Sequence, residues 1–505
     1  MPGRSLSLCH DRRPTEQHTV RSSGRSQLVP QGQGLGVMGG QQCVKFLLRD
    51  GLALVIAGAP LTKEPPSVHW LMNRSSPQLN VDTGPELHYT CSAVFSAKSI
   101  FRPELFTMIA LLISPLYLGL NAYLFHRIIK WFASWFPTLR RKKAWIIPIL
   151  IYAFFALSPL IAFLLPNGEA RRAMKLVGNY WLGVLLYLLL AVALADLGRL
   201  VFVKLLHMKQ LSQPWIHRLV GGLCALAILA MSVGGVINAR IIRTTPYDIT
   251  INKSAGSITE LKVMLIADLH LGYNIGASQM ERMVEKINAE DPDLVVIAGD
   301  IFDNEWEAVQ DPDRIAEILR GIRSRYGVYA CYGNHDIDET ILAGFTFDWH
   351  GAKESSPEMD AFLEQANIRL LRDESVLIGG EIYLYGRPDA HRPGRGITQR
   401  KTAAELTADM DQSKPILVLD HEPDELDELA AAGVDADLCG HTHDGQMFPG
   451  NLTIHLFWEN PCGYLQKGNM HNIVTSGVGL FGPNMRVGTI AEVCPITIHF
   501  TASTQ

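Results

Sequence analysis

The second half of the chain alternates short apolar runs with segments of helical periodicity. Four runs are rich in β-branched residues: LKVMLIA (261–267), DLVVIA (293–298), GVYACY (327–332) and PILVL (415–419). Continuous apolar runs of this length are typical of strands buried on both faces. Between the first three runs, apolar residues recur at helical spacing over 280–287 and 315–322. This order predicts a βαβ fold, in which ligands bind beyond the carboxyl ends of the strands.

The segment 340–412 has a different pattern. Its stretch 368–386 predicts two or three strands, with a turn at Gly379 and Gly380, at the edge of a second sheet. The flanking segments are loop-like. They offer candidate substrate contacts, although each is more simply explained as ordinary loop surface: Trp349, His350, Arg387, His391 and Arg392.

The first half of the chain contains four long apolar stretches, at roughly 105–125, 145–165, 177–203 and 219–239. Each can cross a hydrocarbon core of ~30 Å. We therefore expect an α-helical transmembrane domain of about four spans over 104–240, followed by a linker over 241–254. Asp196 and Arg199, three residues apart near the end of the third stretch, are expected to form a pair at the membrane interface.

Residues 1–103 are rich in Ser, Gly, Arg and Gln and lack sustained periodicity. This composition predicts disorder. The apolar stretch 44–60 is interrupted by charges and is expected to be a short buried or interfacial piece. The change in character near residue 104 also suggests the hypothesis that Met108 is the native start and that the preceding segment is a non-native extension.

Five polar stretches stand out in the second half, four of them directly after an apolar run: DLH (268–270), GDIFD (299–303), GNHD (333–336), DHEP (420–423) and GHTHDG (440–445). A lone histidine in such a loop is more often structural than a ligand. Together, however, the stretches supply a mixed oxygen and nitrogen set: Asp268, His270, Asp300, Asn334, His421, His441 and His443. This set suffices for two divalent ions if one carboxylate bridges them, and it suits Mn, Fe, Zn or Ni. Such two-metal sites serve phosphate ester hydrolysis.

These blocks resemble the signature motifs of the calcineurin-like metallophosphoesterases. The resemblance covers about residues 255–500. GHTHDGQ and the later TSGVGLFGPNMR (475–486) are similar to the membrane-associated branch of that superfamily. The resemblance to this superfamily implies a catalytic domain over 255–502 with an α/β fold, a four-layer α/β/β/α sandwich.

The resemblance also implies roles for individual residues. Asp268, His270 and His443 would hold one metal. Asn334, His421 and His441 would hold the other, and Asp300 would bridge the two. His335 would meet the phosphate or the leaving-group oxygen, with Asp303 orienting it by a hydrogen bond.

Two positions depart from the family pattern. Asn304 follows the GDIFD block, where protein phosphatases of the superfamily carry a phosphate-gripping Arg, so a phosphoprotein substrate is less expected. Asp444 stands where the related branch usually has Gly, which puts the local loop conformation in question.

Charge separates the two halves of the chain. Residues 1–249 contain 26 Lys and Arg against 10 Asp and Glu, whereas 250–505 contain 19 against 40. The strongly acidic second half disfavours nucleic acid as a partner. The basic half suits the anionic membrane surface, and its basic residues concentrate in the connection after the first stretch. By the positive-inside rule that connection is cytoplasmic, and four spans would then place the catalytic domain on the extracytoplasmic side.

The expected function is membrane-anchored, metal-dependent hydrolysis of a phosphodiester or pyrophosphate, by attack of a metal-activated hydroxide. The expected partners are the lipid bilayer and a phosphoester substrate, for which a lipid-linked ester is one candidate. Two alternatives remain open: a catalytically silent membrane scaffold or receptor, and a transporter-like protein that the phosphoesterase domain regulates.

Overall fold

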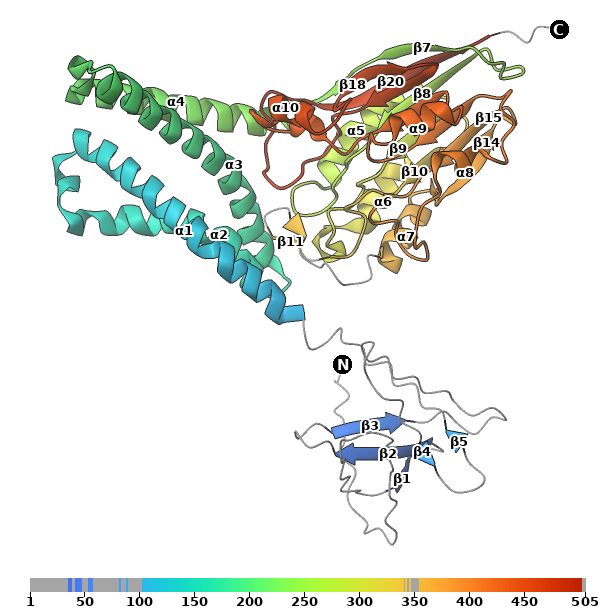
Figure 1. Ribbon diagram of the computed structural model, residues 1–505, viewed down its shortest axis with the longest axis horizontal. Helices are drawn as coiled ribbons and strands as arrows, with labels where there is room; N and C mark the ends of the chain where they lie inside the picture. Colours follow the sequence, from blue (N-terminus) through green and yellow to red (C-terminus); the bar gives the residue numbers. More distant parts are fainter. Residues whose placement is uncertain are drawn as a thin grey trace. The chain divides into compact units, whose positions relative to one another are not determined.

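The computed structural model (Figure 1) describes residues 102–339, 341–342, 345–346 and 354–501, together with five short strands nearer the N-terminus. The chain divides into two compact units, Met1–Thr107 and Met108–Gln505. In the first unit, an antiparallel sheet contains β1 (Leu35–Met38), β2 (Gln41–Leu47) and β3 (Ala53–Ala57), and β4 (Val81–Asp82) pairs with β5 (His88–Tyr89). Strands β2 and β3 occupy much of the apolar stretch 44–60. The predicted disorder of 1–103 otherwise falls outside the described residues.

The second unit contains a group of long helices, of which the first begins a few residues before Met108: α1 (Arg102–Trp135), α2 (Ile146–Leu164), α3 (Glu169–Gly198) with its π-helical continuation η4 (Arg199–Leu205), and α4 (Pro214–Asn238). Short 3₁₀ turns connect them: η2 (Pro137–Arg140), η3 (Lys142–Trp145) and η5 (Lys209–Ser212). Within the described residues, three helical segments are long and apolar enough to cross a membrane: Lys142–Leu164, Glu169–Leu205 and Pro214–Asn238. The expected count of four spans stays a prediction.

The long helices pack through a small internal cluster formed by Leu124, Ala156, Trp181 and Leu185. Many of their other apolar side chains are exposed, above all on α2 and α4, as in helices that face lipid rather than water. The expected pairing of Asp196 with Arg199 was wrong. Asp196 is bonded to Arg127 and Tyr123 of α1, and not paired with Arg199, because the packing of α1 against α3 brings a partner from another helix closer.

The rest of the second unit contains two mixed sheets. The first is a seven-stranded sheet in the order β13-β10-β9-β8-β20-β6, with β7 also paired to β20. Its strands β8, β9, β10 and β13 are parallel to one another, and β20 runs antiparallel to β8. The bounds are β6 (Ile242–Thr244), β7 (Tyr247–Ile251), β8 (Glu260–Ile266), β9 (Leu294–Ala298), β10 (Val328–Cys331), β13 (Ile368–Leu370) and β20 (Ala491–Phe500).

The second sheet has six strands in the order β14-β15-β16-β17-β19-β18, parallel from β15 to β19 with an antiparallel strand at each edge. Its bounds are β14 (Glu374–Ile378), β15 (Ile382–Gly386), β16 (Ile416–Leu419), β17 (Ala436–Cys439), β18 (Gly463–Lys467) and β19 (Met470–Val474). The predicted strands of 368–386 are three. Only β14 and β15 join the second sheet, because β13 pairs with β10 at an edge of the first.

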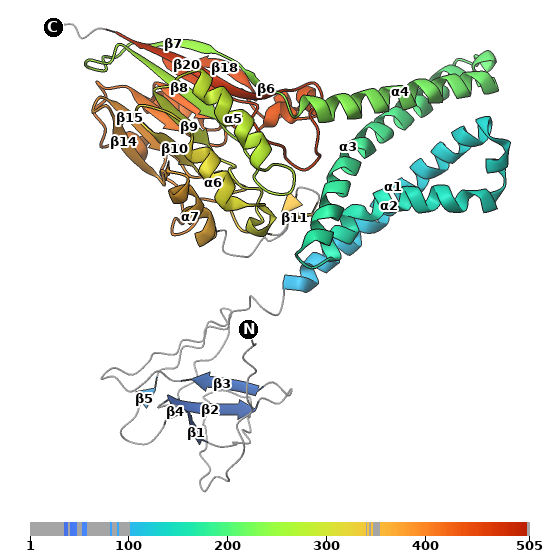
Figure 2. The ribbon, with the colours of Figure 1, turned by 180° about the vertical axis from the view of Figure 1, so that it is seen from behind.

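Helices cover the outer face of each sheet, which gives the expected four-layer α/β/β/α sandwich. Figure 2 shows α5 (Ala277–Ala289), α6 (Pro312–Arg320) and α7 (Pro357–Gln365) over the first sheet. On the second sheet lie α8 (Ala403–Thr407) and α9 (Leu426–Ala431). Shorter elements complete the described unit: β11 (Ile341–Leu342), β12 (Phe345–Thr346), η6 (Trp306–Ala308), η7 (His443–Gly445), α10 (Gly450–Thr453) and η8 (Ile454–Leu456).

The alternation of side chains explains why the strands read as unbroken apolar runs. In β16, Leu417 and Leu419 point into the core between the two sheets, while Ile416 and Val418 pack under α8 and α9. Because both faces are buried, most positions of such a strand are apolar. Polar residues therefore gather where the strands end, and a buried exception such as Asp437 in β17 is hydrogen-bonded, with Asn472 Nδ2 donating to its Oδ2 at 2.9 Å.

The long helices also contact the sandwich directly. Arg171 and Lys175 of α3 pair with Glu305 at 2.8 and 3.2 Å, and Asn179 Nδ2 donates to Asn274 at 2.9 Å. At the end of α4, Asn238 Nδ2 donates to the carbonyl oxygen of Arg486 at 3.1 Å. The N-terminal half of α3 and the C-terminal end of α4 are thus the parts of the helices that pack on the sandwich.

The two-sided burial of β16 gives a test of the layered core. Leu417→Ala should lower the free energy of unfolding by about 3 kcal/mol, because it leaves a cavity between the sheets. The matched control is Leu377→Ala, on the exposed edge strand β14, where the side chain is 49% exposed. Thermal melting of the full-length protein in detergent should show a clear loss for the first variant and little change for the second. Equal melting temperatures for the two variants would contradict the layer assignment.

Candidate metal centre

The polar residues singled out in the sequence lie in loops that follow the strands. Asp268 and His270 follow β8, Asp300 follows β9, and Asn334 follows β10 in the first sheet. His421 follows β16, and His441 and His443 follow β17 in the second. Because these strands are parallel within their sheets, their carboxyl ends meet at one edge, and the loops converge there. All seven predicted metal-binding residues come together in this cluster.

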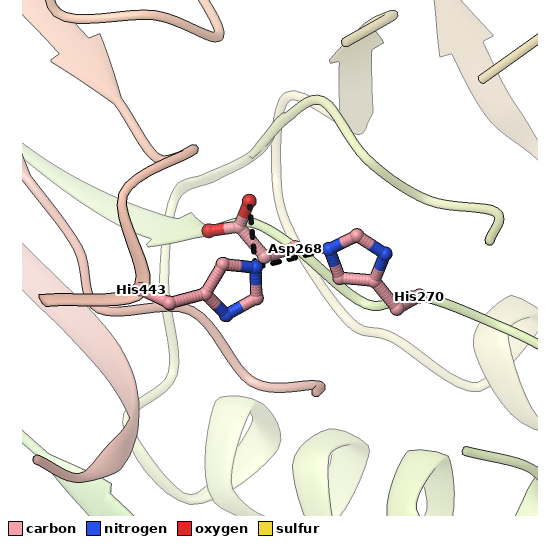
Figure 3. Close-up of side chains that lie close together, drawn as sticks. All are labelled: Asp268, His270 and His443. Carbon is pink, nitrogen blue, oxygen red and sulfur yellow. Dashed lines mark hydrogen bonds and ion pairs between the residues drawn. The ribbon is translucent and has the colours of Figure 1, made fainter. Parts of the chain in front are cut away.

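The first group consists of Asp268, His270 and His443 (Figure 3). The Nε2 atoms of His270 and His443 lie 3.0 Å apart, and His443 Nε2 lies 3.8 Å from Asp268 Oδ1. All three side chains are buried. They present nitrogen and oxygen atoms to one common point, as ligands of a single ion would.

The second group consists of Asp300, His421 and His441, joined by Asn334. Asn334 Oδ1 lies 3.0 Å from both His421 Nε2 and His441 Nδ1, and these two nitrogens are 3.1 Å apart. Asp300 lies between the two groups, since its Oδ2 is 3.2 Å from His421 Nε2 and 3.6 Å from His270 Nε2. Its carboxylate therefore faces ligand atoms of both groups.

The donor set fits divalent cations. Four imidazole nitrogens meet in two close pairs, around carboxylates that are themselves buried. Asp268 Oδ2 is a buried oxygen without a hydrogen-bond partner in the described residues. Burial, with Asp300 nearby, raises the pKa of Asp268 to about 6, despite the opposing effect of His421. A cation at this point would satisfy the orphaned oxygen and favour its charged form.

The ring orientation of His421 is fixed by the backbone. Its Nδ1 lies 2.8 Å from the carbonyl oxygen of Ala298, which can only accept, so Nδ1 carries the hydrogen. Nε2 is then left with its lone pair toward Asn334 and Asp300. This arrangement, a backbone acceptor behind a metal-binding histidine, is typical of metal sites.

The loops adopt strained backbone conformations. Asp268, His270, Asp300, His441 and His443 all have positive φ, between 46° and 71°. Non-glycine residues rarely adopt this region, and such residues cluster at functional sites. Glycine is also required at positions where the backbone lies against a neighbouring side chain. At Gly299, with φ +75°, an added Cβ would lie 2.5 Å from His421 Nδ1, and at Gly477 it would lie 2.6 Å from Asp268 Cβ.

Asp444 adopts a left-handed conformation, with φ 52° and ψ 33°. Asp tolerates this region better than most residues do. Its backbone N–H donates to Thr442 Oγ1 at 3.2 Å. The replacement of Gly by Asp therefore leaves the loop in a conformation that glycine would also adopt.

His335 is buried beside the cluster, and its backbone N–H donates to Asp300 Oδ1 at 2.8 Å. Burial lowers the pKa of His335 to about 4, against the opposing effect of Asp300. The structure gives its ring a different partner from the one expected. His335 Nδ1 is bonded to Asn304 Oδ1, while Asp303 Oδ1 lies 3.5 Å from His270 Nδ1. The residue that replaces the protein-phosphatase Arg is thus the one that orients His335.

The candidate substrate contacts have different outcomes. Arg387 is fully buried and pairs with Asp420 at 2.7 Å and with Glu425 at 2.5 Å, so it is structural. Arg392 Nη1 donates to the carbonyl oxygen of Asn334 at 3.0 Å, which places its charge beside the cluster. His391 is exposed. Trp349 and His350 lie outside the described residues.

Two residues of the 475–486 stretch were missed as site residues. The Phe481 ring lies 4.9 Å from the His335 ring and 6.0 Å from the His270 ring, between centroids, so it covers both histidines. Arg486, fully buried, donates to the carbonyl oxygens of Ser476 and Gly479 at 2.6 and 3.0 Å and fixes this loop. The repetition of Gly in TSGVGLFG was the available signal, since it indicates close backbone approach.

Comparisons with known proteins agree with this geometry. The sequence profile of the calcineurin-like phosphoesterase family matches residues 261–445. The transmembrane protein with metallophosphoesterase domain of Danio rerio is 30% identical over 405 residues, which cover 77% of this chain and 88% of that protein. The protein of the same name from Bos taurus is 28% identical over 296 residues, covering 54% and 62%. An uncharacterized metallophosphoesterase of Aquifex aeolicus is 29% identical over 242 residues, covering 48% and 85%.

The chain therefore belongs to the calcineurin-like metallophosphoesterases. Members of this family use divalent metals, and the histidine and aspartate groups of this chain offer places for them. Similarity to transmembrane relatives, together with the apolar helices, identifies it as a membrane protein.

Metal binding can be tested without a substrate. Manganese added to chelator-stripped, full-length protein should raise the melting temperature, because an ion at 100 times its Kd stabilises the folded state by about 2.7 kcal/mol. For a domain of this size that corresponds to roughly 5–10 °C. Asp300→Asn should lose most of the rise, since it removes the charge that faces both groups.

The matched control for this measurement is His499→Asn. His499 lies beside Glu260 at the beginning of β8, the opposite end of that strand from the cluster. This variant should keep the full manganese response. The metal site would be contradicted if neither manganese nor any other divalent transition metal changed the melting temperature of the wild-type protein.

Proposed function

We propose that this protein is a membrane-anchored, dinuclear metal-dependent phosphoesterase that hydrolyses a phosphodiester or a pyrophosphate. The observation that carries the proposal is the position of Asp300 between two separate ligand groups. Asp268, His270 and His443 would hold one ion, and Asn334, His421 and His441 the other, with Asp300 bridging. Two such ions supply Lewis acidity at phosphorus and lower the pKa of bound water.

The chain's own residues add positioning and proton transfer. His335 lies beside Asp300, and its bond to Asn304 fixes the ring. With Nδ1 turned toward Asn304, Nε2 is the atom available to the leaving-group oxygen. The negative charge of a bound phosphate favours the protonated ring, which can then donate to that oxygen.

Positive charge from protein side chains is scarce at this edge of an acidic domain. Two described cations lie beside the cluster: Arg392, which donates to the backbone of Asn334 and pairs with Glu339 at 3.4 Å, and Arg486, whose Nη2 lies 3.2 Å from His443 Nδ1. Asn304 carries no charge, so this position lacks the arginine with which protein phosphatases of the superfamily bind a phosphomonoester dianion. Binding of such a dianion is expected to be weaker in this chain. This difference favours a phosphodiester, which carries a single negative charge.

Hydrolysis can be measured with bis(p-nitrophenyl) phosphate and p-nitrophenyl phosphate in the presence of manganese. The full-length protein should prefer the diester, and Asp300→Asn should abolish turnover. His335→Asn should lower kcat by about 10²–10⁴-fold, the usual contribution of a positioned acid, while the manganese-dependent melting shift stays intact.

A protein that binds manganese in the melting assay but hydrolyses neither ester would contradict the proposed activity. That outcome would favour the silent scaffold or receptor. The transporter-like alternative is separated by the cellular phenotype of Asp300→Asn, because a phenotype that survives this change does not depend on hydrolysis.

We also propose four spans with the phosphoesterase domain on the extracytoplasmic or lumenal side. The α1–α2 and α3–α4 connections lie at the helix ends opposite to those that pack on the sandwich. They contain much of the positive charge of this region: Arg140, Arg141, Lys142, Lys143 and Lys209. The positive-inside rule assigns such connections to the cytoplasm.

Trypsin treatment of sealed vesicles with the cytoplasmic face outward tests this orientation. The two basic connections should be cleaved without detergent, whereas the domain over 250–505 should stay protected until detergent dissolves the membrane. Cleavage within 250–505 in sealed vesicles would place the domain in the cytoplasm. A marker protein sealed inside the vesicles controls for leakage.

A further inference from the structure

An exposed apolar surface lies directly beside the metal-binding cluster. It is formed by Phe448, Leu452, Leu456 and Phe457, whose side chains are 41%, 62%, 80% and 78% exposed. We call these four residues the apolar patch. Between Asp444 and Glu459 the sequence contains no Asp, Glu, Lys or Arg. Such a stretch is unusual on the surface of a strongly acidic domain, and clustered exposed apolar residues mark interaction sites.

The patch is continuous with the membrane helices. Met447, directly before Phe448, is buried in a cluster with Tyr187 of α3 and Met485, against which Ile228 and Met231 of α4 also pack. Figures 1 and 2 both place this segment, which contains α10, beside the C-terminal end of α4.

Backbone hydrogen bonds fix this connection. The N–H of Phe448 donates to the carbonyl oxygen of Val487 at 2.7 Å, and the N–H of Arg486 donates to Gly235 of α4 at 3.0 Å. The segment 446–448 is therefore linked to α4 through residues 486 and 487, which are hydrogen-bonded to both. Its position relative to the apolar helices is set by backbone contacts as well as side-chain packing.

The same segment also reaches the cluster. The Trp458 ring, next to Phe457, lies 5.1 Å from the ring of His441 between centroids. Thr442 Oγ1, between His441 and His443, donates to the carbonyl oxygen of Pro461. An unbroken series of contacts thus links α4, the apolar patch and the predicted metal ligand His441.

We propose that the apolar patch lies in the bilayer that the helices cross, and that the metal centre takes an amphiphilic phosphoester from this membrane. The hydrocarbon portion of the substrate would stay against the patch while its phosphoester reaches His441 and its neighbours. The occupant is lipid because the patch extends an apolar surface that already faces lipid, and because it carries no charge to match a polar partner. The substrate class rests on the proposed hydrolase function, whereas the membrane contact does not.

Photo-crosslinking tests the membrane contact without any assay of activity. A benzophenone amino acid replaces Phe457 in the full-length protein, in nanodiscs of phosphatidylcholine with phosphatidylglycerol, and replaces Leu377 of β14 in the control. Mass spectrometry after illumination should find phospholipid attached at 457 and none at 377. Crosslinks from 457 to a second copy or to residues 1–101 would identify another occupant and overturn the proposal, as would the absence of lipid adducts.

Hydrolysis tests the substrate class. Leu456→Ser combined with Phe457→Ser should lower the rate on a long-chain phosphodiester in nanodiscs at least tenfold relative to the rate on its water-soluble short-chain analogue. Leu377→Ser, the control, should leave this ratio unchanged. An unchanged ratio in the double variant would overturn the substrate class. If the wild type hydrolyses neither ester, the proposed function fails, while the crosslinking result still decides the membrane contact.

Discussion

The structure of the phosphoesterase domain depends on one electrostatic constraint, the burial of Asp268 and Asp300 among four histidine rings. Taking carboxylates out of water is costly unless positive charge or hydrogen bonds compensate. Asp300 receives a backbone hydrogen bond from His335 and contacts from His421 and His270. Asp268 has an oxygen with no partner among the described residues. Cations at the two ligand groups would resolve this imbalance, so the site and the stability of its loops depend on the same ions.

The two-sheet scaffold makes this constraint tolerable. Parallel strands buried on both faces hold their carboxyl ends rigidly, so loops with unfavourable φ values can be maintained by the packing below them. Glycine at 299 and 477 lets the backbone approach His421 and Asp268 where a side chain would collide. The fully buried Arg486 holds the loop of residues 475–486 in place by donating hydrogen bonds to its backbone carbonyl groups. The packing of the two sheets thus compensates for the unfavourable backbone conformations in the loops of the site.

The membrane helices are structural neighbours of the site as well as an anchor. Arg171 and Lys175 of α3 hold Glu305, which directly follows Asn304, the residue bonded to His335. Asn238 of α4 is bonded to the backbone of Arg486. Both ends of the site therefore rest on helices that face lipid. This arrangement gives a physical reason for covalent attachment of the two parts, since residues of α3 and α4 bond to segments beside the candidate metal site.

The sequence by itself indicated strands alternating with helices and supplied the seven candidate ligands, whereas the four-layer sandwich followed from the resemblance to the family. Apolar runs rich in β-branched residues indicated the strands, and the polar residues directly after them fall at the edge where ligands bind. The segment 368–386 was read correctly as strands. Its division between two sheets depends on which partner each strand meets, and local periodicity contains no information about partners.

Only the tertiary structure decided the contacts between segments far apart in the chain. Asp303 was expected to orient His335, but Asn304 is its partner, because the turn after Asp300 points the two side chains in different directions. Asp196 is bonded to Arg127 rather than to Arg199, since helix packing brings α1 closer than the next turn of the same helix. The contacts of Phe481 with the rings of His335 and His270 became visible for the same reason. Spacing along the chain identifies which groups are available, whereas packing in three dimensions decides which of them meet.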